Sequence, residues 1–473
     1  MKKTTCFLVF PHQLFADIEK HAGGDLATFI LWDDPVFYGD RRGSPHGAAQ
    51  LRLNPLRIAY ANAAVTAFLA AHPRIRHVTT ESLTALPLSR RYATLSDYDR
   101  VVALDPVDVL LEARLARARV PVTYLDSPAF LLTRAEIAAY SERVRDHTRL
   151  QQGQFYAYLK ATVTPGLGPI ADIASQDTAN RAPFPRKATP PALPGPAIDP
   201  ATGAATTPTA ARAWLARFLR DRFALFGPYE DAVVAESPWM YHSGLSVFLN
   251  FGLLTPREVL DAVAAHVRSL PAAEQRRPEI VASYEGFVRQ LAGWREYARF
   301  YYRHVPPAKY TKNVFNLRRA PGNRPPPAWY RGTTGLPTVD AAITDAFRDG
   351  YLHHIRRLMV VSNAMTLSGV HPDAVFTWMY EFALDSWDWV MVFNVYGMGT
   401  WSDGGVGMRK PYISGPGYLH RMVRDGLSKE EAAEWDRLFK AFLVAHADTL
   451  EHTQLAGVVR KAVAAATATA TNQ

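Results

Sequence analysis

The chain has 473 residues, of which 48% are hydrophobic, and it carries a formal net charge of +9 at pH 7. This length predicts two or three domains, and the hydrophobic content excludes global disorder. Because Cys6 is the only cysteine, the chain can form no internal disulfide, no cysteine zinc site and no cysteine-ligated iron–sulfur cluster.

The sequence contains no apolar run of membrane-spanning length. The apolar stretch that follows Met1 is broken at Pro11, too early for a signal peptide. A single cysteine fits a reducing compartment. We therefore expect a cytoplasmic monomer without a membrane partner.

The first 150 residues alternate between two kinds of pattern. Short apolar runs of strand length stand at 5–10, 28–32, 100–104 and 120–125. Helical patterns lie between them at 56–71 and 107–118. This alternation predicts an α/β domain over 1–150 with a doubly wound parallel sheet. No GxGxxG follows the first strand, so a dinucleotide fingerprint is absent.

Eight prolines fall among Ala, Thr and Gly between 183 and 210. This composition predicts an exposed linker, and we assign 151–210 as the interdomain segment. Beyond it, apolar residues recur three and four apart, which predicts an all-helical domain over 211–460. The predicted helices span 212–226, 243–254, 256–269, 278–302, 339–368, 372–392 and 428–446. The Ala/Thr-rich tail, 461–473, is expected to fray.

Two adjacent histidines, His353 and His354, stand one helical turn before Arg357. A histidine pair on a helix is more often a surface or packing feature than a functional one. Neighbouring side chains on a helix point about 100° apart, so one histidine can donate a proton while the other orients it.

Longer words then point to a known family. The string from Trp239 to Leu254, preceded by 226–231 and followed by 285–297, resembles the flavin-binding region of the photolyase/cryptochrome superfamily. The resemblance is greatest to the bacterial (6-4) photolyase-like branch, which normally carries an iron–sulfur cluster, and it extends from Phe7 to Tyr418. It implies an N-terminal antenna domain and a helical domain that binds FAD. The FAD contacts that it implies are Tyr229, His242, Ser243, Ser246, Gln290, Trp294, Arg295, Asp385 and Asn394.

The same resemblance implies light-driven repair of (6-4) pyrimidine photoproducts in UV-damaged DNA. Reduced FAD would inject an electron while histidine transfers a proton, after the damaged nucleotide has left the base stack. The implied catalytic residues are His353, His354, Arg357, Met398 and Tyr412. A basic stretch with interleaved Tyr310 and Phe315 suits phosphate contact and aromatic stacking, although a solvated basic loop explains it equally well. Its cations are Lys309, Lys312, Arg318, Arg319 and Arg324.

Several positions depart from the family pattern. Thr338 stands at the place of the first cluster cysteine, and 425–451 contains no cysteine, so we expect no 4Fe-4S cluster. Trp378 matches the flavin-proximal electron donor, but Met379 replaces the aromatic residue that usually follows it. The next family tryptophan aligns with Tyr330. Electron transfer is then either broken or rerouted, and the candidate residues for a new route are Trp329, Tyr380 and Trp387.

The antenna pigment and the activity remain open at this point. The family often binds 6,7-dimethyl-8-ribityllumazine beyond its first strands, but here His12 precedes Gln13 where a Gly-Asp pair is usual. Both an empty and a filled antenna pocket are compatible with this sequence motif. The alternatives to DNA repair are a cryptochrome-type photoreceptor and a small-molecule flavoenzyme on the same fold.

Overall fold

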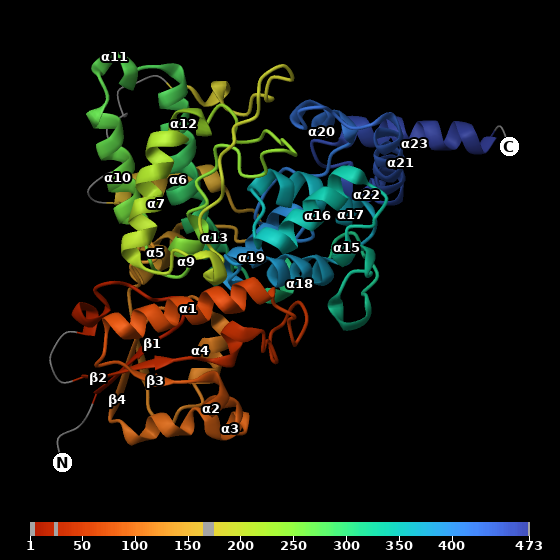
Figure 1. The fold of residues 1–473 in the computed structure, drawn as a ribbon. Coiled ribbons are helices and arrows are strands. Elements are labelled where there is room, and N and C mark those ends of the chain that lie inside the picture. Colours follow the sequence, from red (N-terminus) through yellow and green to blue (C-terminus); the bar gives the residue numbers. More distant parts are fainter. Residues whose placement is uncertain (1–4, 23–26, 164–174, 472–473) are drawn as a thin grey trace.

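A computed structural model describes residues 5–22, 27–163 and 175–471. The chain folds into an α/β part and a helical part, as predicted (Figure 1). Among the described residues, no helix combines the length and the apolar character needed to cross a bilayer.

The α/β part is built on a five-stranded parallel sheet with the order β3-β2-β1-β4-β5. Its strands are β1 (Thr5–Val9), β2 (Ala27–Trp32), β3 (Arg76–Val78), β4 (Arg100–Leu104) and β5 (Val122–Leu125). Thr5 of the central strand pairs with Ala27 on one side and with Arg100 on the other. The four predicted strands are confirmed. Strand β3 was not predicted, because three residues that include Arg76 and His77 show no strand pattern.

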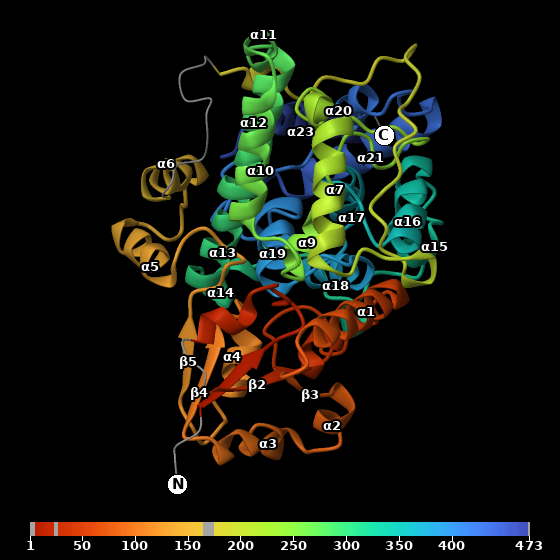
Figure 2. The ribbon, with the colours of Figure 1, turned by 60° about the vertical axis from the view of Figure 1, so that its left-hand side comes forward.

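The helices of this part are α1 (Pro55–Ala71), α2 (Thr80–Thr84), α3 (Leu88–Arg91), α4 (Val109–Leu115) and α5 (Arg134–Arg143). Helix α1 begins at Pro55, and the Asn54 side chain caps it by accepting a hydrogen bond from the Leu56 amide. This helix lies between the sheet and the helical part, whereas α2 and α3 lie on the far side (Figure 1 and Figure 2).

The helical part contains ordinary helices and three π-helical segments. The helices are α6 (Gln152–Thr162), α7 (Pro208–Asp221), α8 (Phe223–Phe226), α9 (Ser246–Asn250), α10 (Pro256–Ser269), α11 (Ala272–Gln275), α12 (Pro278–Val288), α13 (Arg295–His304), α14 (Pro307–Tyr310), α15 (Ala328–Arg331), α16 (Pro337–Asp349), α17 (Asn363–Leu367), α18 (Pro372–Phe382), α19 (Asp388–Val392), α20 (Pro416–Met422), α21 (Lys429–Ala445), α22 (Ala447–Leu450) and α23 (Ala456–Thr471). The π-helical segments are η6 (Arg289–Trp294), η8 (Arg356–Ser362) and η9 (Phe393–Gly399).

The proline-rich segment 183–210 is mostly exposed or partly exposed, and a few buried residues anchor it to the helices. Phe184 is buried with Ala232, Val234 and Met240, and Ile198 belongs to the main core. The buried Arg222 donates a hydrogen bond to the Pro194 carbonyl. Proline and alanine bury little surface themselves, but they let the backbone follow the helices closely enough for these anchors to reach them.

The C-terminal tail differs from its prediction, because residues 461–471 continue helix α23 and do not fray. Alanine is the strongest helix former, and α23 packs beside α21 before it extends away from the body (Figure 1). Residues 472–473 lie outside the described residues.

Two predicted long helices are interrupted near the site. Helix α16 ends at Gly350, whose φ of 60° favours glycine and whose added Cβ would collide with Leu384. His353 therefore precedes the next helical turns and does not share a regular helix with His354. The predicted helix 372–392 is split into α18 and α19 by the segment 383–387.

A buried arginine of the α/β part holds this interrupting segment. Arg57 on α1 donates hydrogen bonds to the carbonyls of Tyr380 (3.3 Å), Ala383 (3.1 Å) and Ser386 (2.7 Å). Its guanidinium also lies over the Trp387 ring, 4.7 Å from the centroid. The segment that carries Asp385 thus takes its shape from the neighbouring domain.

Candidate cofactor and active site

A cavity of about 910 Å³ opens within the helical part, at the upper end of the range for small-molecule and cofactor sites. It is lined by most of the residues that the resemblance implies for FAD and for catalysis. These are His242, Ser243, Ser246, Gln290, Trp294, Arg295, His354, Arg357, Asp385, Asn394, Met398 and Tyr412.

The three π-helical segments supply much of the cavity wall. Gln290 and Trp294 come from η6, Arg357 from η8, and Asn394 and Met398 from η9. π-Helical turns are rare and are found frequently at functional sites, because the extra residue in the turn re-aims side chains. Helical periodicity of 3.6 does not reveal them, so the sequence predicted regular helices here.

An ion pair crosses the cavity wall. Arg357 Nη1 and Nη2 lie 3.0 and 3.1 Å from the two carboxylate oxygens of Asp385, which also accepts a hydrogen bond of 2.6 Å from Ser246 Oγ. Asn250 Nδ2 donates to the Asp385 carbonyl. This network fixes one polar group in a largely apolar cavity. Ser246 opens α9, which has five residues, and Ser243 lies before it, outside the helix predicted over 243–254.

Trp294 and Arg295 contribute differently although they are adjacent. Trp294 Nε1 lies 3.2 Å from Met398 Sδ across the cavity wall. The Arg295 guanidinium instead binds Asn250 Oδ1 (2.6 Å) and the Ala129 carbonyl (3.3 Å), between the rings of Phe130 and Trp389. Burial lowers the pKa of Arg295 to about 10. Its charged end therefore joins the two domains, while the rest of the side chain lines the cavity.

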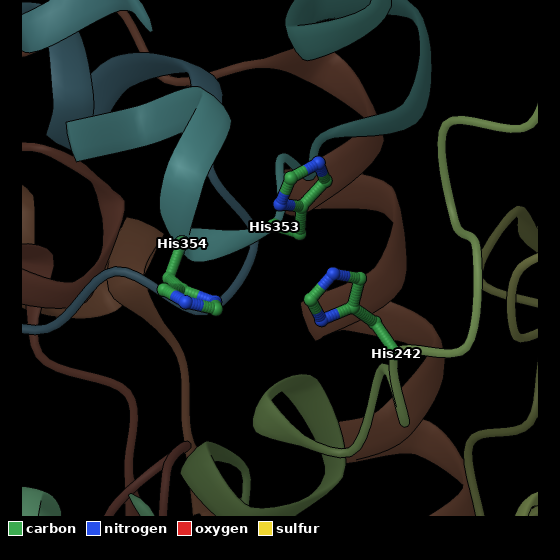
Figure 3. A group of neighbouring side chains, drawn as sticks. All are labelled: His242, His353 and His354. Atoms are coloured by element: carbon green, nitrogen blue, oxygen red, sulfur yellow. The ribbon is translucent and has the colours of Figure 1, made fainter. Parts of the chain in front are cut away.

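Three histidines meet at one end of the cavity (Figure 3). His242 and His353 are buried and stack with centroids 4.4 Å apart and planes 12° apart, whereas His354 is half-exposed and lines the cavity. Burial lowers the pKa of His242 to about 3 and that of His353 well below its ordinary value, with the neighbouring histidines adding to both shifts. The two buried rings are therefore neutral. His353 does not line the cavity but stands behind His242.

Two residues that sequence reasoning left unassigned hold His354. Asp231 Oδ1 lies 3.3 Å from His354 Nε2, and Asp231 Oδ2 accepts a hydrogen bond of 3.0 Å from Tyr418. Burial alone would raise the pKa of Asp231, but the interactions with His354 and Tyr418 bring it below its ordinary value. Asp231 is thus a carboxylate, and as an acceptor it requires the hydrogen on His354 Nε2. Both residues lie in the part of the sequence that resembles the family. Because they are far from His354 in the sequence, no sequence pattern indicated that they contact it.

The predicted electron-transfer residues lie outside the cavity. Trp378 is fully buried, and its Nε1 donates to the Trp329 carbonyl at 2.7 Å. Phe347 stands between the rings of Trp378 and Tyr330, and the Tyr330 hydroxyl donates to the buried Glu381 at 2.7 Å. The residue of this group that reaches the cavity is Met379. Tyr380 and Trp387 instead flank Arg57 at the domain boundary.

Two further predicted features have a different structural role. Tyr229 does not line the cavity and packs on Phe184 and Tyr241. In the basic stretch, Lys309, Lys312 and Arg318 are exposed, whereas Arg319 is ion-paired with Asp373 and Arg324 with Glu381. The interleaved aromatics are buried: Tyr310 bonds to His46, and Phe315 packs on Phe442. They therefore cannot stack on bases, because their side chains belong to the core.

At the position of the implied cluster cysteine, Thr338 binds helix α21. Its amide and its hydroxyl both donate to Glu431, at 2.8 and 3.0 Å. Phe439 and Phe442 on the same helix are buried. The hydrogen bonds between Thr338 and Glu431, together with apolar packing, hold α16 and α21 together here.

The region beyond the first strand is filled by protein side chains. Gln13 donates to the carbonyls of Leu104 and Asp105. His12 is buried, binds the Pro106 carbonyl and packs on Phe37 and Trp387. The cavity beside it has a volume of about 10 Å³, room for about one water molecule. The groups present at this place do not fit a ribityllumazine pigment.

Comparison with known proteins identifies the family to which the chain belongs. Residues 7–213 match the family model described as deoxyribodipyrimidine photo-lyase-related protein, and residues 287–412 match the FAD binding domain of DNA photolyase. The chain belongs to the photolyase/cryptochrome family. It is 35% identical over 222 residues to a (6-4) photolyase of Agrobacterium fabrum, a match that spans 46% of this chain and 41% of that relative. It is also 39% identical over 122 residues to an uncharacterised protein of Acanthamoeba polyphaga mimivirus, covering 26% of this chain and 85% of that protein.

Solved structures show the same fold at low identity. The Synechocystis cryptochrome superposes with a TM-score of 0.58 at 14% identity, covering 93% of this chain and 88% of that one. A bacterial class III photolyase from Agrobacterium tumefaciens gives a TM-score of 0.54 at 16% identity, with coverage of 94% and 87%.

The residues around the large cavity of this photolyase/cryptochrome family member fit FAD. The FAD-binding domain match covers η6, η8, η9 and Tyr412, so the matched segment and the cavity wall coincide. The Arg357–Asp385 pair and the amides of Gln290 and Asn394 supply polar groups for a flavin, while Leu249, Met379 and Val390 supply apolar contact.

Proposed function

We propose that this protein repairs (6-4) pyrimidine photoproducts in DNA, using light absorbed by FAD. The observation that carries the proposal is the placement of His354 on the cavity wall, where Asp231 orients it, together with Met398, Tyr412 and Tyr418. A proton donor and two phenols thus face the same space as the predicted flavin contacts. The 35% identity to a (6-4) photolyase over 222 residues, 46% of this chain, supports the same choice of lesion.

When bound, reduced and illuminated, FAD would supply an electron to the lesion. The residues of the chain bind the damaged nucleotide, exclude water and move a proton. Because Asp231 holds His354 Nε2–H, His354 Nδ1 is the nitrogen left to face the substrate. An Nδ1–H proton delivered there leaves a neutral ring, and the Asp231 carboxylate holds the charged imidazolium before that transfer.

His353 acts behind His354 in this scheme. It is buried and neutral, and it stacks on His242. A group in this environment positions its neighbours and does not carry the proton, because desolvation disfavours its charged form. The sequence predicted that one of the two adjacent histidines donates the proton and that the other orients it. In this scheme His354 is the donor and His353 is the positioning residue.

Exposed cations at the cavity rim suit the DNA backbone. Lys410, Arg421 and Arg181 line the cavity and are exposed, and the half-buried Arg289 stands beside Glu230. A damaged nucleotide that has left the stack can enter between such phosphate contacts. The cations at 309–324 can extend the same electrostatic surface.

The deciding experiment is illumination of the reduced flavoprotein with an oligonucleotide that holds one (6-4) lesion, followed by chromatography of the bases. We expect restored pyrimidines from the native protein, a loss of at least about 100-fold with His354→Ala, and a smaller loss with Asp231→Asn. His452→Ala, on the surface, is the matched control. A flavoprotein that binds light-reduced FAD but restores no pyrimidine would assign it instead to photoreception or to small-molecule chemistry.

A further inference from the structure

Ring nitrogens from three histidines converge on one point. His242 comes from the segment before α9, and His353 and His354 come from the turns before η8 (Figure 3). One nitrogen from each ring lies within 4.8 Å of the other two. The 110 residues between the first and second of them hide this cluster from any reading of sequence spacing.

The buried nitrogens of this cluster lack hydrogen-bond partners within the described part of the chain. They are both nitrogens of His353 and Nε2 of His242. The two side chains are only 1% and 5% exposed, so bulk water does not satisfy them. Leaving a buried polar group unpaired costs about 1–3 kcal/mol. A neutral imidazole carries one N–H and one lone pair, so each of these two buried rings can offer one lone pair to a ligand, and leaving that lone pair unused is unfavourable.

The surrounding charges do not exclude a cation here. Asp231 contributes a carboxylate that contacts His354. The nearby guanidinium groups are already engaged, by backbone carbonyls at Arg222, by Asp345 at Arg356 and by Asp385 at Arg357.

Asp231 also prepares His354 as a ligand. The carboxylate accepts the hydrogen of Nε2, which leaves the lone pair on Nδ1. A histidine that donates its other N–H to a carboxylate is the usual arrangement behind a protein metal ligand, because it fixes the tautomer and raises the basicity of the ring. Tyr418 in turn holds the second oxygen of Asp231.

We propose that His242, His353 and His354 form a binding site for a divalent transition metal of the zinc class, with an open fourth position toward the large cavity. Three protein ligands and one open position are typical of exchangeable or catalytic zinc sites. Zinc–nitrogen bonds of about 2.0–2.1 Å place tetrahedral ligand atoms about 3.4 Å apart, so the rings must close by just over 1 Å. His354 is half-exposed and can rotate to do so.

The observations that support this metal site do not depend on the proposed repair reaction. A metal bound at the site would nevertheless compete with that reaction. A metal takes the lone pairs of the histidines and prevents their use in proton transfer. The metal-loaded protein should therefore restore pyrimidines at least tenfold more slowly than the metal-free protein.

The test is a titration of the untagged, chelator-treated flavoprotein with Co²⁺ and then Zn²⁺ in the dark, without DNA. We expect one equivalent of Co²⁺ with the visible absorption bands of a four-coordinate ion, displaced by Zn²⁺. His354→Ala should weaken binding at least tenfold, and Asp231→Asn by about 10–100-fold. His452→Ala, which removes a surface histidine, should bind as the native protein does.

The outcomes separate this proposal from the repair proposal. Absence of the bands, or equal affinity in the native protein, His354→Ala and Asp231→Asn, would overturn the metal site whatever the repair assay gives. A protein that binds Co²⁺ as expected but restores no pyrimidine would retain the site and lose the repair function. Because His354 is half-exposed, His354→Ala keeps the test valid even if substitution of buried His242 or His353 prevents folding.

Discussion

At the scale of single residues, the site depends on a few buried polar groups that have exact partners. Arg357 and Asp385 satisfy each other in the cavity wall, and Ser246 and Asn250 complete the shell around Asp385. Removal of one member leaves the other charged and desolvated, which costs more than the pair contributes. The same reasoning applies to isolated buried histidines elsewhere in the chain.

Asp385→Asn should reduce flavin retention. The substitution leaves the Arg357 guanidinium without a carboxylate in the cavity wall, at a cost of about 3–5 kcal/mol. We expect the flavin-to-protein absorbance ratio of the purified variant to fall at least tenfold. Asp221→Asn, which removes two ion pairs outside the cavity, with Arg217 and Arg220, is the matched control. Full flavin occupancy in Asp385→Asn would show that the pair is not part of the cofactor wall.

His12 should make the fold sensitive to acid. Burial lowers the pKa of His12 to about 4, from an ordinary 6.5. Between these values the unfolded chain binds the proton and the folded protein does not, so stability falls as the pH falls from 6.5 toward 4. Between pH 7.5 and pH 5 the loss is about 2 kcal/mol.

The measurement is urea unfolding at both pH values. His12→Gln keeps a donor for the Pro106 carbonyl but does not titrate, so the pH dependence of its unfolding free energy should be smaller by that amount. An unchanged pH dependence would mean that His12 is solvated in the folded protein.

At the scale of elements, helix interruptions determine where functional side chains go. Gly350 ends α16, and the π-helical turns of η6, η8 and η9 re-aim the residues that line the cavity. A helical pattern in sequence reports which residues are apolar but not where an extra residue enters a turn. The predicted helices therefore lie in the right segments but are wrong at the interruptions, and the helix predicted over 243–254 is reduced to α9.

Helix α18 presents a test of electron supply. Trp378 is buried beside Phe347, and Met379 takes the cavity-facing place. If electrons pass through Trp378, Trp378→Phe should slow light-driven flavin reduction by an external reductant at least tenfold, because phenylalanine is much harder to oxidise than tryptophan. Repair by chemically reduced enzyme should be unchanged. Trp387→Phe serves as the comparison, and a slow phenotype confined to that variant would place the route at the domain boundary.

Sequence reasoning predicted the chain architecture and most of the cavity residues, and its failures have physical causes. Asp231 lies in the segment 226–231 that resembles the family, but its contact with His354 spans 123 positions and leaves no local sequence pattern. Tyr310 and Phe315 were read as stacking residues because periodicity in a short basic loop cannot distinguish buried from exposed aromatics. Residues 461–471 were read as frayed because low complexity was weighed above the helix propensity of alanine.

At the scale of the whole molecule, part of the positive charge lies at the cavity rim. The cations Lys410 and Arg421 are exposed where they line the cavity. Binding of a DNA backbone releases condensed counterions in proportion to the phosphates contacted, so affinity measured across salt counts these contacts.

Lys410→Ala/Arg421→Ala should weaken binding to lesion-containing DNA and reduce the slope of log affinity against log salt by about 2. The measurement is fluorescence anisotropy over a salt series. Lys440→Ala/Arg437→Ala, which removes two cations that are ion-paired on α21, should leave the slope unchanged. Equal slopes for native protein and rim variant would place DNA elsewhere or exclude it.

The hydrogen bonds from Arg57 to the carbonyls of Tyr380, Ala383 and Ser386 have a consequence for unfolding. Melting the sheet domain would remove this guanidinium from the segment that carries Asp385, and melting the helical domain would remove the carbonyl acceptors and the rings that pack on Arg57. Neither half can therefore lose its structure alone at low cost. The two domains should unfold in a single cooperative transition, and flavin release should coincide with the loss of the sheet.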